Sequence, residues 1–103
     1  MRIMVEFNMP TEHGNEVVRS GKIKDIFEKL GAQFKPEAMY FRPVNGNRGG
    51  FMVINTDDPA IDVAVGEAFW FGLQAEVTIT PCMNAEDLGQ GLSKMPKILE
   101  NFG

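Results

Sequence analysis

The sequence predicts an α+β domain with the element order β-α-β-β-α-β and a further helix at its C-terminal end. Three observations support this prediction. Residues 51–54 form an uninterrupted apolar run of β-forming residues, the pattern of a strand buried on both faces. A turn rich in Asn and Gly precedes the run at residues 45–49, and apolar residues recur at helical spacing over residues 61–72. We expect the rest of the chain to be organised around this strand and helix.

The length and composition are those of one domain. The chain has 103 residues, of which 44% are hydrophobic and 23% are charged, as in ordinary globular proteins. We therefore expect a single domain over residues 1–103. The only cysteine, Cys82, excludes a disulfide within the chain and fits a reducing compartment. With no signal peptide and no run of about 18 apolar residues, we expect a cytoplasmic protein without a membrane partner.

The net charge of −4 is unevenly distributed along the chain. Residues 1–48 hold 8 basic and 6 acidic side chains, whereas residues 49–103 hold 2 and 8. Binding to nucleic acid draws most of its non-specific affinity from the neutralisation of phosphates by basic side chains. A nucleic-acid partner is therefore not expected, and we interpret the acidic second half as ordinary solvation.

The first part of the chain predicts a strand followed by a helix. Residues 2–9 alternate in polarity as a first strand does, and Pro10 ends that strand. Thr11 or Asn15 is expected to cap the helix that follows.

The first helix and the second strand have clear ends. Gly31 should end the helix, and Ser20 and Gly21 weaken its middle. Residues 38–44 have strand character, and the Asn-Gly turn after them predicts antiparallel pairing with the next strand.

The second helix is predicted to begin after a short acidic stretch. Asp57 or Asp58 can supply an N-cap oxygen, and Pro59 fits the first turn of a helix. Gly72 is the expected end. Apolar residues nearly encircle this segment, so we expect a mostly buried helix.

The C-terminal part predicts a fourth strand over residues 75–83 and a last helix. Asn84 and Asp87 resemble a capping box for that helix, and Pro96 should kink or end it. The apolar residues beyond Pro96 have no obvious place inside one small domain. We therefore expect a neighbouring element or subunit to cover this tail, which contains Ile98, Leu99 and Phe102.

The element order β-α-β-β-α-β is that of the split β-α-β, or ferredoxin-like, arrangement, in which both helices cover one face of a four-stranded antiparallel sheet. The other face would carry a mixture of polar and apolar side chains, and such a surface favours association. Two sheets meeting face to face would cover it and leave a lined cavity.

Four stretches of the chain carry a resemblance to a known family. They are the N-terminal strand MRIMVEFNMP, Arg-Gly-Gly-Phe at 48–51, Thr-Asp-Asp-Pro-Ala at 56–60, and Ala-Glu-Val-Thr-Ile-Thr-Pro at 75–81. With them the sequence resembles the dimeric α/β-barrel superfamily of ferredoxin-like proteins, and in particular a small uncharacterised bacterial domain family within it. The resemblance implies a homodimer whose barrel holds a small hydrophobic or aromatic molecule. Related families include monooxygenases, isomerases, haem enzymes and pure binders, so the fold alone does not select a function.

Five residues are candidates for contact with such a ligand. Glu6 is the candidate catalytic acid or base if burial raises its pKa, and the alternative is a partner for Arg2, for Arg42 or for a subunit across the interface. Tyr40 and Arg42 share one face of the second strand and together could hold an anionic or phenolic ligand. Asn8 would orient a ligand carbonyl or else form a hydrogen bond at the strand end. Trp70 would flank a ligand or else belong to the core.

No metal or cofactor is expected. The only histidine, His13, has no second histidine or cysteine near it in sequence, and we expect it in an exposed loop.

Two classes of function remain open. The first is a small-molecule-binding dimeric α/β-barrel protein, whose catalysis would be that of a cofactor-independent oxygenase or isomerase. The second is a non-catalytic dimerisation or regulatory ligand-binding module. An enclosed pocket containing Glu6 or Arg42 would favour the first class, and a barrel packed solid with side chains would favour the second.

Overall fold

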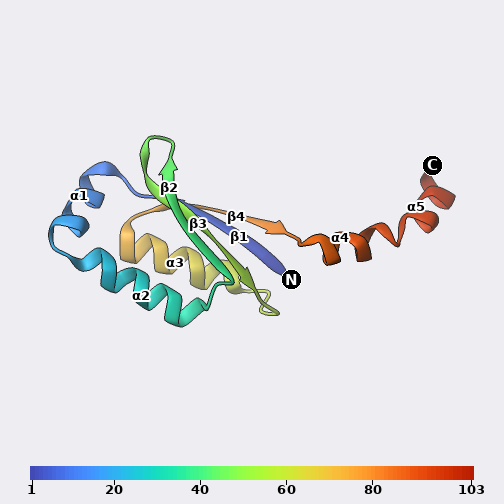
Figure 1. The fold of residues 1–103 in the computed structure, drawn as a ribbon, viewed down its shortest axis with the longest axis horizontal. Coiled ribbons are helices and arrows are strands. Elements are labelled where there is room, and N and C mark those ends of the chain that lie inside the picture. The colour runs from blue at the N-terminus through green and yellow to red at the C-terminus, as the bar shows by residue number, and fades with distance from the viewer.

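The computed structural model describes residues 1–103 as four strands and five helices. The elements in chain order are β1 Arg2–Asn8, α1 Thr11–Arg19, α2 Lys22–Phe34, β2 Ala38–Val44, β3 Asn47–Asn55, α3 Ile61–Leu73, β4 Glu76–Cys82, α4 Ala85–Leu92 and α5 Met95–Phe102. The first seven elements form a packed body, residues 1–83. The last two form an arm, residues 84–103, that extends away from the body (Figure 1). The predicted α+β class is confirmed.

The four strands form one antiparallel sheet with the order β2-β3-β1-β4. β1 therefore lies between β3 and β4, and Glu6 faces Phe51 on one side and Thr78 on the other. β2 and β3 are joined by a turn in which Asn45 and Gly46 have φ of 52° and 81°, the backbone that Asn-Gly turns favour in hairpins. The predicted pairing of the second and third strands is confirmed.

One face of the sheet is covered by α2 and α3, which lie on the same side of it (Figure 1). Because side chains alternate along a strand, the buried residues of β1 on this face are Ile3, Val5 and Phe7. The ring of Phe7 stacks on that of Phe69 from α3, with 4.8 Å between centroids. The rest of the core cluster consists of Met9, Val17, Leu30, Phe34, Met52, Ile54, Val65, Leu73 and Ala75.

The opposite face of the sheet, which we call the open face, carries no helix of this chain (Figure 1). Along β3, Met52 and Ile54 are buried on the covered face, whereas Phe51 and Val53 on the open face are only half-buried. The expectation that residues 51–54 are buried on both faces is therefore not met within one chain, because the helices cover one face alone.

The predicted first helix is in fact two helices. Neither Thr11 nor Asn15 caps α1, whose N-cap position is Pro10 and which has no side-chain cap. The break follows Ser20, where Gly21 takes a φ of 77° that an L-residue rarely adopts. α1 and α2 can therefore pack on the body in different directions.

The predicted end at Gly31 is wrong, since α2 continues for three more residues. Its last residue, Phe34, is buried in the core, and Lys35 ends the helix with a φ of 47°. A glycine inside a helix costs about 1 kcal/mol, and burial of a phenylalanine stabilises by about 1.5–3 kcal/mol. Packing of Phe34 therefore outweighs the local signal to stop.

α3 starts and stops slightly later than its sequence signals suggest. No side chain caps it. Instead Asp58 Oδ1 accepts a hydrogen bond from the Ala60 N–H at 2.9 Å, which closes the turn before the helix begins at Ile61. The helix ends one residue beyond Gly72, and Gln74 closes it with a φ of 49°.

α3 is buried on one side only. Val65, Phe69 and Leu73 point into the core, whereas the outward-facing Trp70 and Phe71 are 50% and 85% exposed. The prediction of a mostly buried helix is therefore wrong, because only one layer lies beneath α3 and nothing in the chain covers its outer side.

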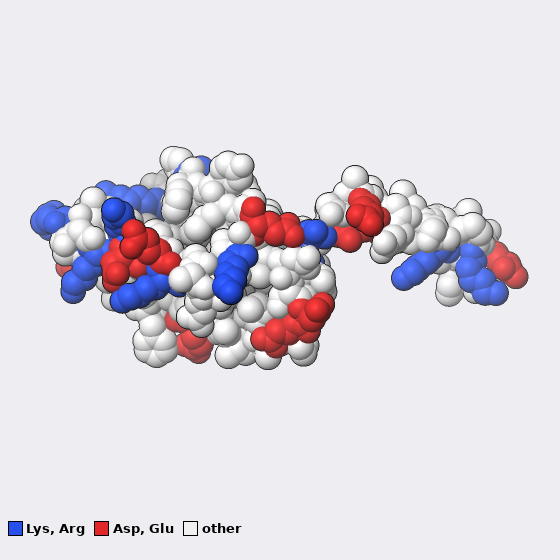
Figure 2. Space-filling model, turned by 60° about the horizontal axis from the view of Figure 1, so that its bottom comes forward, with Lys and Arg blue, Asp and Glu red and all other residues white.

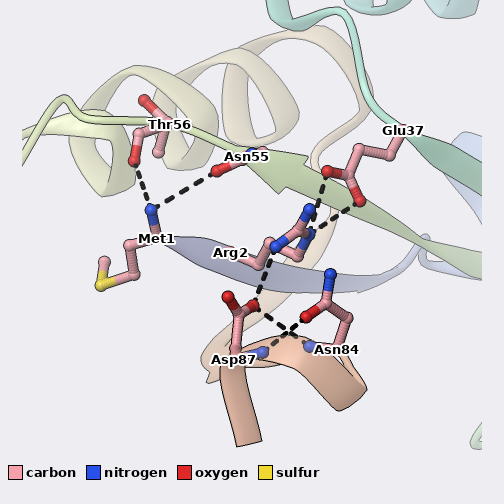
Figure 3. A network of polar contacts seen from close by, with 7 residues as sticks. All are labelled: Met1, Arg2, Glu37, Asn55, Thr56, Asn84 and Asp87. Carbon is pink, nitrogen blue, oxygen red and sulfur yellow. Dashed lines mark hydrogen bonds and ion pairs between the residues drawn. The ribbon is translucent and has the colours of Figure 1, made fainter. Parts of the chain in front are cut away.

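The predicted capping box at the start of the arm is confirmed. Asn84 Oδ1 accepts a hydrogen bond from the Asp87 N–H at 2.8 Å, and Asp87 Oδ2 accepts one from the Asn84 N–H at 3.2 Å (Figure 3). A turn at Ser93 and Lys94 separates α4 from α5, which has Pro96 in its first turn. No residue of α4 or α5 is buried.

None of the helices combines the length and the apolar character that crossing a membrane would require.

Candidate functional site

Four of the five predicted site residues lie on the open face of the sheet. Glu6 and Asn8 come from β1, and Tyr40 and Arg42 come from β2. The register places Tyr40 opposite Phe51 and Arg42 opposite Gly49 in β3, the strand that separates β2 from β1. The site is therefore a surface spanning three adjacent strands.

Glu6 and Arg42 contact each other directly. Arg42 Nη2 donates to Glu6 Oε2 at 3.3 Å, and Arg42 Nη1 donates to the Pro43 carbonyl at 3.0 Å. The two side chains meet across β3, where Gly49 has no side chain to separate them. They are 34% and 54% exposed, so the ion pair is open to an approaching ligand.

Tyr40 adds an aromatic and hydroxyl surface beside this pair. Its ring lies 5.6 Å from that of Phe51 between centroids, and its hydroxyl makes no hydrogen bond within the chain. Met4 and Val53 continue the apolar part of the same face. The open face therefore combines one ion pair, one free phenol and an apolar surface.

Asn8 is held at the end of β1 by its neighbours. Its Nδ2 donates to Glu76 Oε2, and its Oδ1 accepts from Asn47 Nδ2, both at 3.4 Å. The side chain is thus already used in bonds between strand ends, which is the structural alternative to a ligand contact.

Trp70 lies apart from the other four residues. It belongs to α3, on the helix side of the sheet, and its ring covers Gly66, where an added Cβ would lie 2.9 Å from the ring. The structure does not bring Trp70 together with Glu6, Tyr40 or Arg42.

A pocket of about 470 Å³ opens beside Arg42, on the helix side of the β2–β3 hairpin. This volume lies within the range of small-molecule sites. Phe27 of α2 and Phe41 of β2 meet edge to face within it, with 5.0 Å between centroids. The lining residues are Met9, Ile23, Phe27, Phe41, Arg42, Pro43, Arg48 and Gly49.

No pattern in the sequence predicted this pocket. Its second basic residue, Arg48, donates from Nη1 to Asn15 Oδ1 at 2.9 Å and so leans toward α1. Strand alternation could have placed Phe41 on the face opposite Tyr40 and Arg42. The contact of that residue with α2 depends on helix packing, which carries no local signal.

His13 is not in a loop, because it lies in the first turn of α1. Its Nδ1 is 3.8 Å from Glu16 Oε2, and its buried Nε2 has no hydrogen-bond partner. No group of three or more His, Cys, Asp or Glu side chains is arranged to hold a metal ion.

A second polar cluster lies at the root of the arm, around Arg2 (Figure 3). Arg2 Nε donates to Glu37 Oε1 at 3.0 Å and Arg2 Nη1 donates to Asp87 Oδ2 at 2.8 Å. The hydrogen bond that Arg2 donates to the Glu37 carboxylate raises the pKa of Arg2 further above its usual range. The Asn84 N–H, assisted by Arg2, lowers the pKa of the Asp87 carboxyl, and partial desolvation opposes this shift. This cluster joins β1, the start of β2 and the arm.

A known family matches most of the chain. The profile of a family described as Domain of unknown function (DUF3303) matches residues 1–96. No curated protein matches the chain. The comparison thus supplies a family without an activity.

Proposed function

Since the chain belongs to the DUF3303 family, a family of unknown function, we propose a role from the site alone: a homodimeric small-molecule-binding protein of the ferredoxin-like, dimeric α/β-barrel type. In this proposal residues 1–103 act as one domain, and two open faces meet around a small hydrophobic or aromatic ligand that carries an anionic or phenolic group.

The arrangement of the sheet supports the ferredoxin-like part of the proposal. The body has the element order strand, helical segment, strand, strand, helix, strand, and the sheet order β2-β3-β1-β4 matches the split β-α-β pattern. The extra break that divides α1 from α2 leaves the strand pairing unchanged.

The open face supports the pairing of two copies. Phe51 and Val53 are half-buried and Tyr40 is 62% exposed, so apolar and aromatic side chains of the sheet are in contact with water. A surface of this kind favours association with a second protein surface. Two identical copies would bury it symmetrically.

The observation that carries the ligand-binding proposal is the Glu6–Arg42 pair on this uncovered face. A guanidinium binds a planar anion with two parallel hydrogen bonds, and the free hydroxyl of Tyr40 can donate a third. An aromatic ring between them would rest on Phe51. The pocket beside Arg42, lined by Phe27 and Phe41, offers a second apolar surface to the same charge.

Catalysis is an extension of this proposal. Glu6 already has Arg42 as its partner at 3.3 Å, so it would act as an acid or base only after a ligand displaces that arginine. The same pairing favours the alternative, a non-catalytic dimerisation or regulatory ligand-binding module, because each charge is satisfied by the other. The geometry thus supports binding ahead of any oxygenase or isomerase reaction.

The test begins with native mass spectrometry of protein purified from its source, which reports the number of chains and any retained small molecule. Calorimetry then compares variants with 4-hydroxybenzoate as the probe, since it carries the predicted aromatic ring, phenol and carboxylate. Arg42→Ala should weaken binding by about 2 kcal/mol, roughly 30-fold, because a hydrogen bond to a charged group is lost. His13→Ala, at a distance from the open face, should change it by less than about 0.5 kcal/mol.

Two further variants separate the open face from the pocket. Tyr40→Phe removes only the hydroxyl on the open face, and Phe41→Ala removes only a ring of the pocket. A loss with Tyr40→Phe alone supports the open face, whereas a loss with Phe41→Ala alone moves the site to the helix side. Equal affinity of wild type and Arg42→Ala would overturn the ligand-binding proposal.

A further inference from the structure

The arm carries a continuous apolar stripe that its own chain leaves uncovered. The stripe follows the spacing i, i+4, i+7 through both helices, which is the pattern of a helix face that packs on another surface. Its terminal side chain, Phe102, is 86% exposed. The residues of the stripe are Leu88, Leu92, Met95, Ile98, Leu99 and Phe102.

The outer side of α3 is the second uncovered apolar helix face. Val63, Trp70 and Phe71 are 66%, 50% and 85% exposed, and Ala64 lies beside them. Residues at spacings of three, four and seven share one side of a helix. These four therefore form one patch, which we call the α3 patch, with Glu67 in its middle.

Both faces carry acidic side chains, which in the arm are Glu86, Asp87 and Glu100, but only the arm carries basic ones. One of its two lysines, Lys97, lies 3.7 Å from Glu100. Lys94 and Lys97 are the only basic residues after Arg48, and both lie at the start of α5. Residues 57–73, which lead into α3 and form it, hold four acidic side chains and no basic one. In Figure 2 blue side chains lie along the lower side of the arm, and a group of red side chains lies on the lower part of the body. The acidic side chains of residues 57–73 are Asp57, Asp58, Asp62 and Glu67.

We propose that the arm of one copy packs on the α3 patch of a second copy of the same chain. The apolar stripe would cover Val63, Trp70 and Phe71, and the arm's lysines would lie among the acidic residues that border α3. Charge complementarity of this kind selects the orientation of two helices as well as the partner. Neither surface then stays exposed to water.

A second copy fits better than the arm's own body because of how the arm is rooted. Asp87 is bonded to Arg2 at 2.8 Å and forms the capping box with Asn84, and Arg2 is also bonded to Glu37. These contacts direct the arm away from α3 of the same chain (Figure 1), and folding back would break the contact with Arg2. Reciprocal exchange of two arms satisfies both copies in a closed, two-fold assembly.

This contact uses the helix side of the body, so it does not depend on the proposed pairing of open faces. The two contacts can be told apart, because each predicts a loss of association in a different set of variants. Substitutions in the arm stripe should leave the open face intact, and substitutions on the open face should leave the α3 patch intact.

The single tryptophan of the chain makes the test direct, because Trp70 lies in the α3 patch. Acrylamide quenching of Trp70 fluorescence is measured for the full chain over a range of concentrations, alongside sedimentation. The test variant is Ile98→Ser with Leu99→Ser. The matched control is Gln90→Ser with Asn101→Ser, which places the same residues at polar positions of the arm.

In wild type and control, Trp70 should be shielded at high micromolar concentration and should become accessible on dilution. In the test variant the quenching constant should be at least about twofold higher at high concentration, as expected when a large aromatic surface loses its cover. Equal quenching of wild type and test variant at all concentrations would overturn the proposal. Shielding that persists in a monomer would also overturn it, since the arm would then cover its own chain.

Disulfide trapping identifies the contact between copies. In a Cys82→Ser background, chains with Glu67→Cys are mixed with differently tagged chains with Lys97→Cys and oxidised. A disulfide between the two tagged chains is expected, and Lys22→Cys in place of Lys97→Cys should give none. If open faces pair but arms do not exchange, Phe51→Asp still dissociates the dimer while no mixed disulfide forms.

Discussion

The two faces of the same sheet differ sharply in what covers them. On the covered face, Phe7 and Met52 have no exposed surface and pack against α2 and α3. On the open face, Phe51 is half-buried and Tyr40 is 62% exposed, although both are aromatic. Apolar character alone thus does not bury a strand residue, because burial also requires a second layer, and this chain supplies only one.

The difference also separates stability from function in this protein. The covered face is apolar except for Arg48 near the start of β3, and it holds the fold together through close packing. The open face mixes apolar residues with the Glu6–Arg42 pair, a combination that recognises a ligand better than it stabilises a core. The comparison can be tested by substitutions on each face.

The largest effect is expected on the covered face. Phe7→Ala removes a fully buried ring that lies 4.8 Å from Phe69 and 5.6 Å from Phe27 between centroids. The free energy of unfolding should fall by about 3–5 kcal/mol, since the cavity adds to the lost burial. Chemical denaturation followed by circular dichroism measures this. Met4→Ala on the open face is the control, and an equal loss there would contradict the difference between the faces.

The next effect concerns association rather than folding. Phe51→Asp should lower the free energy of unfolding of the monomer by about 1 kcal/mol or less, because the site is only half-buried. It should nevertheless dissociate the proposed dimer, since an unpaired charge would be buried between two sheets. Val53→Asp should act in the same way.

Sedimentation at micromolar concentration checks this prediction. Gln33→Asp introduces the same charge at an exposed position of α2, on the other side of the sheet, and should leave the dimer intact. Unchanged association of Phe51→Asp and Val53→Asp would place the interface elsewhere.

The smallest effect is expected at the root of the arm, where Asp87 of α4 pairs with Arg2 at the end of the open face. The pKa of Asp87 is lowered in the folded chain, so its stabilising contribution is complete above its unfolded pKa of about 4 and is lost as the pH falls through the folded value. Hydrogen exchange should therefore show α4 losing protection below about pH 4 while β1 keeps it. In Asp87→Asn this pH dependence should disappear. Equal pH dependence of α4 in wild type and Asp87→Asn would show that another group controls the arm.

Much of the fold could be predicted from local patterns. The second strand, the Asn45-Gly46 turn and the capping box of Asn84 and Asp87 all lie where the sequence indicates. Alternation along β1 and β2 also placed Glu6, Tyr40 and Arg42 on one side of the sheet. These features depend on neighbouring residues in the chain, whose backbone preferences and side-chain directions act over a few positions.

The sequence by itself thus determined the α+β class, the strands and the residues that share a face. Only the tertiary structure decided the exposure of Trp70 on α3, the extension of α2 to Phe34, the direct contact of Glu6 with Arg42, and the pocket between α2 and the hairpin. Each of these depends on which layer lies above or below a residue and on how far apart two elements pack. Such distances arise from contacts between segments that are remote in sequence, and no local pattern encodes them.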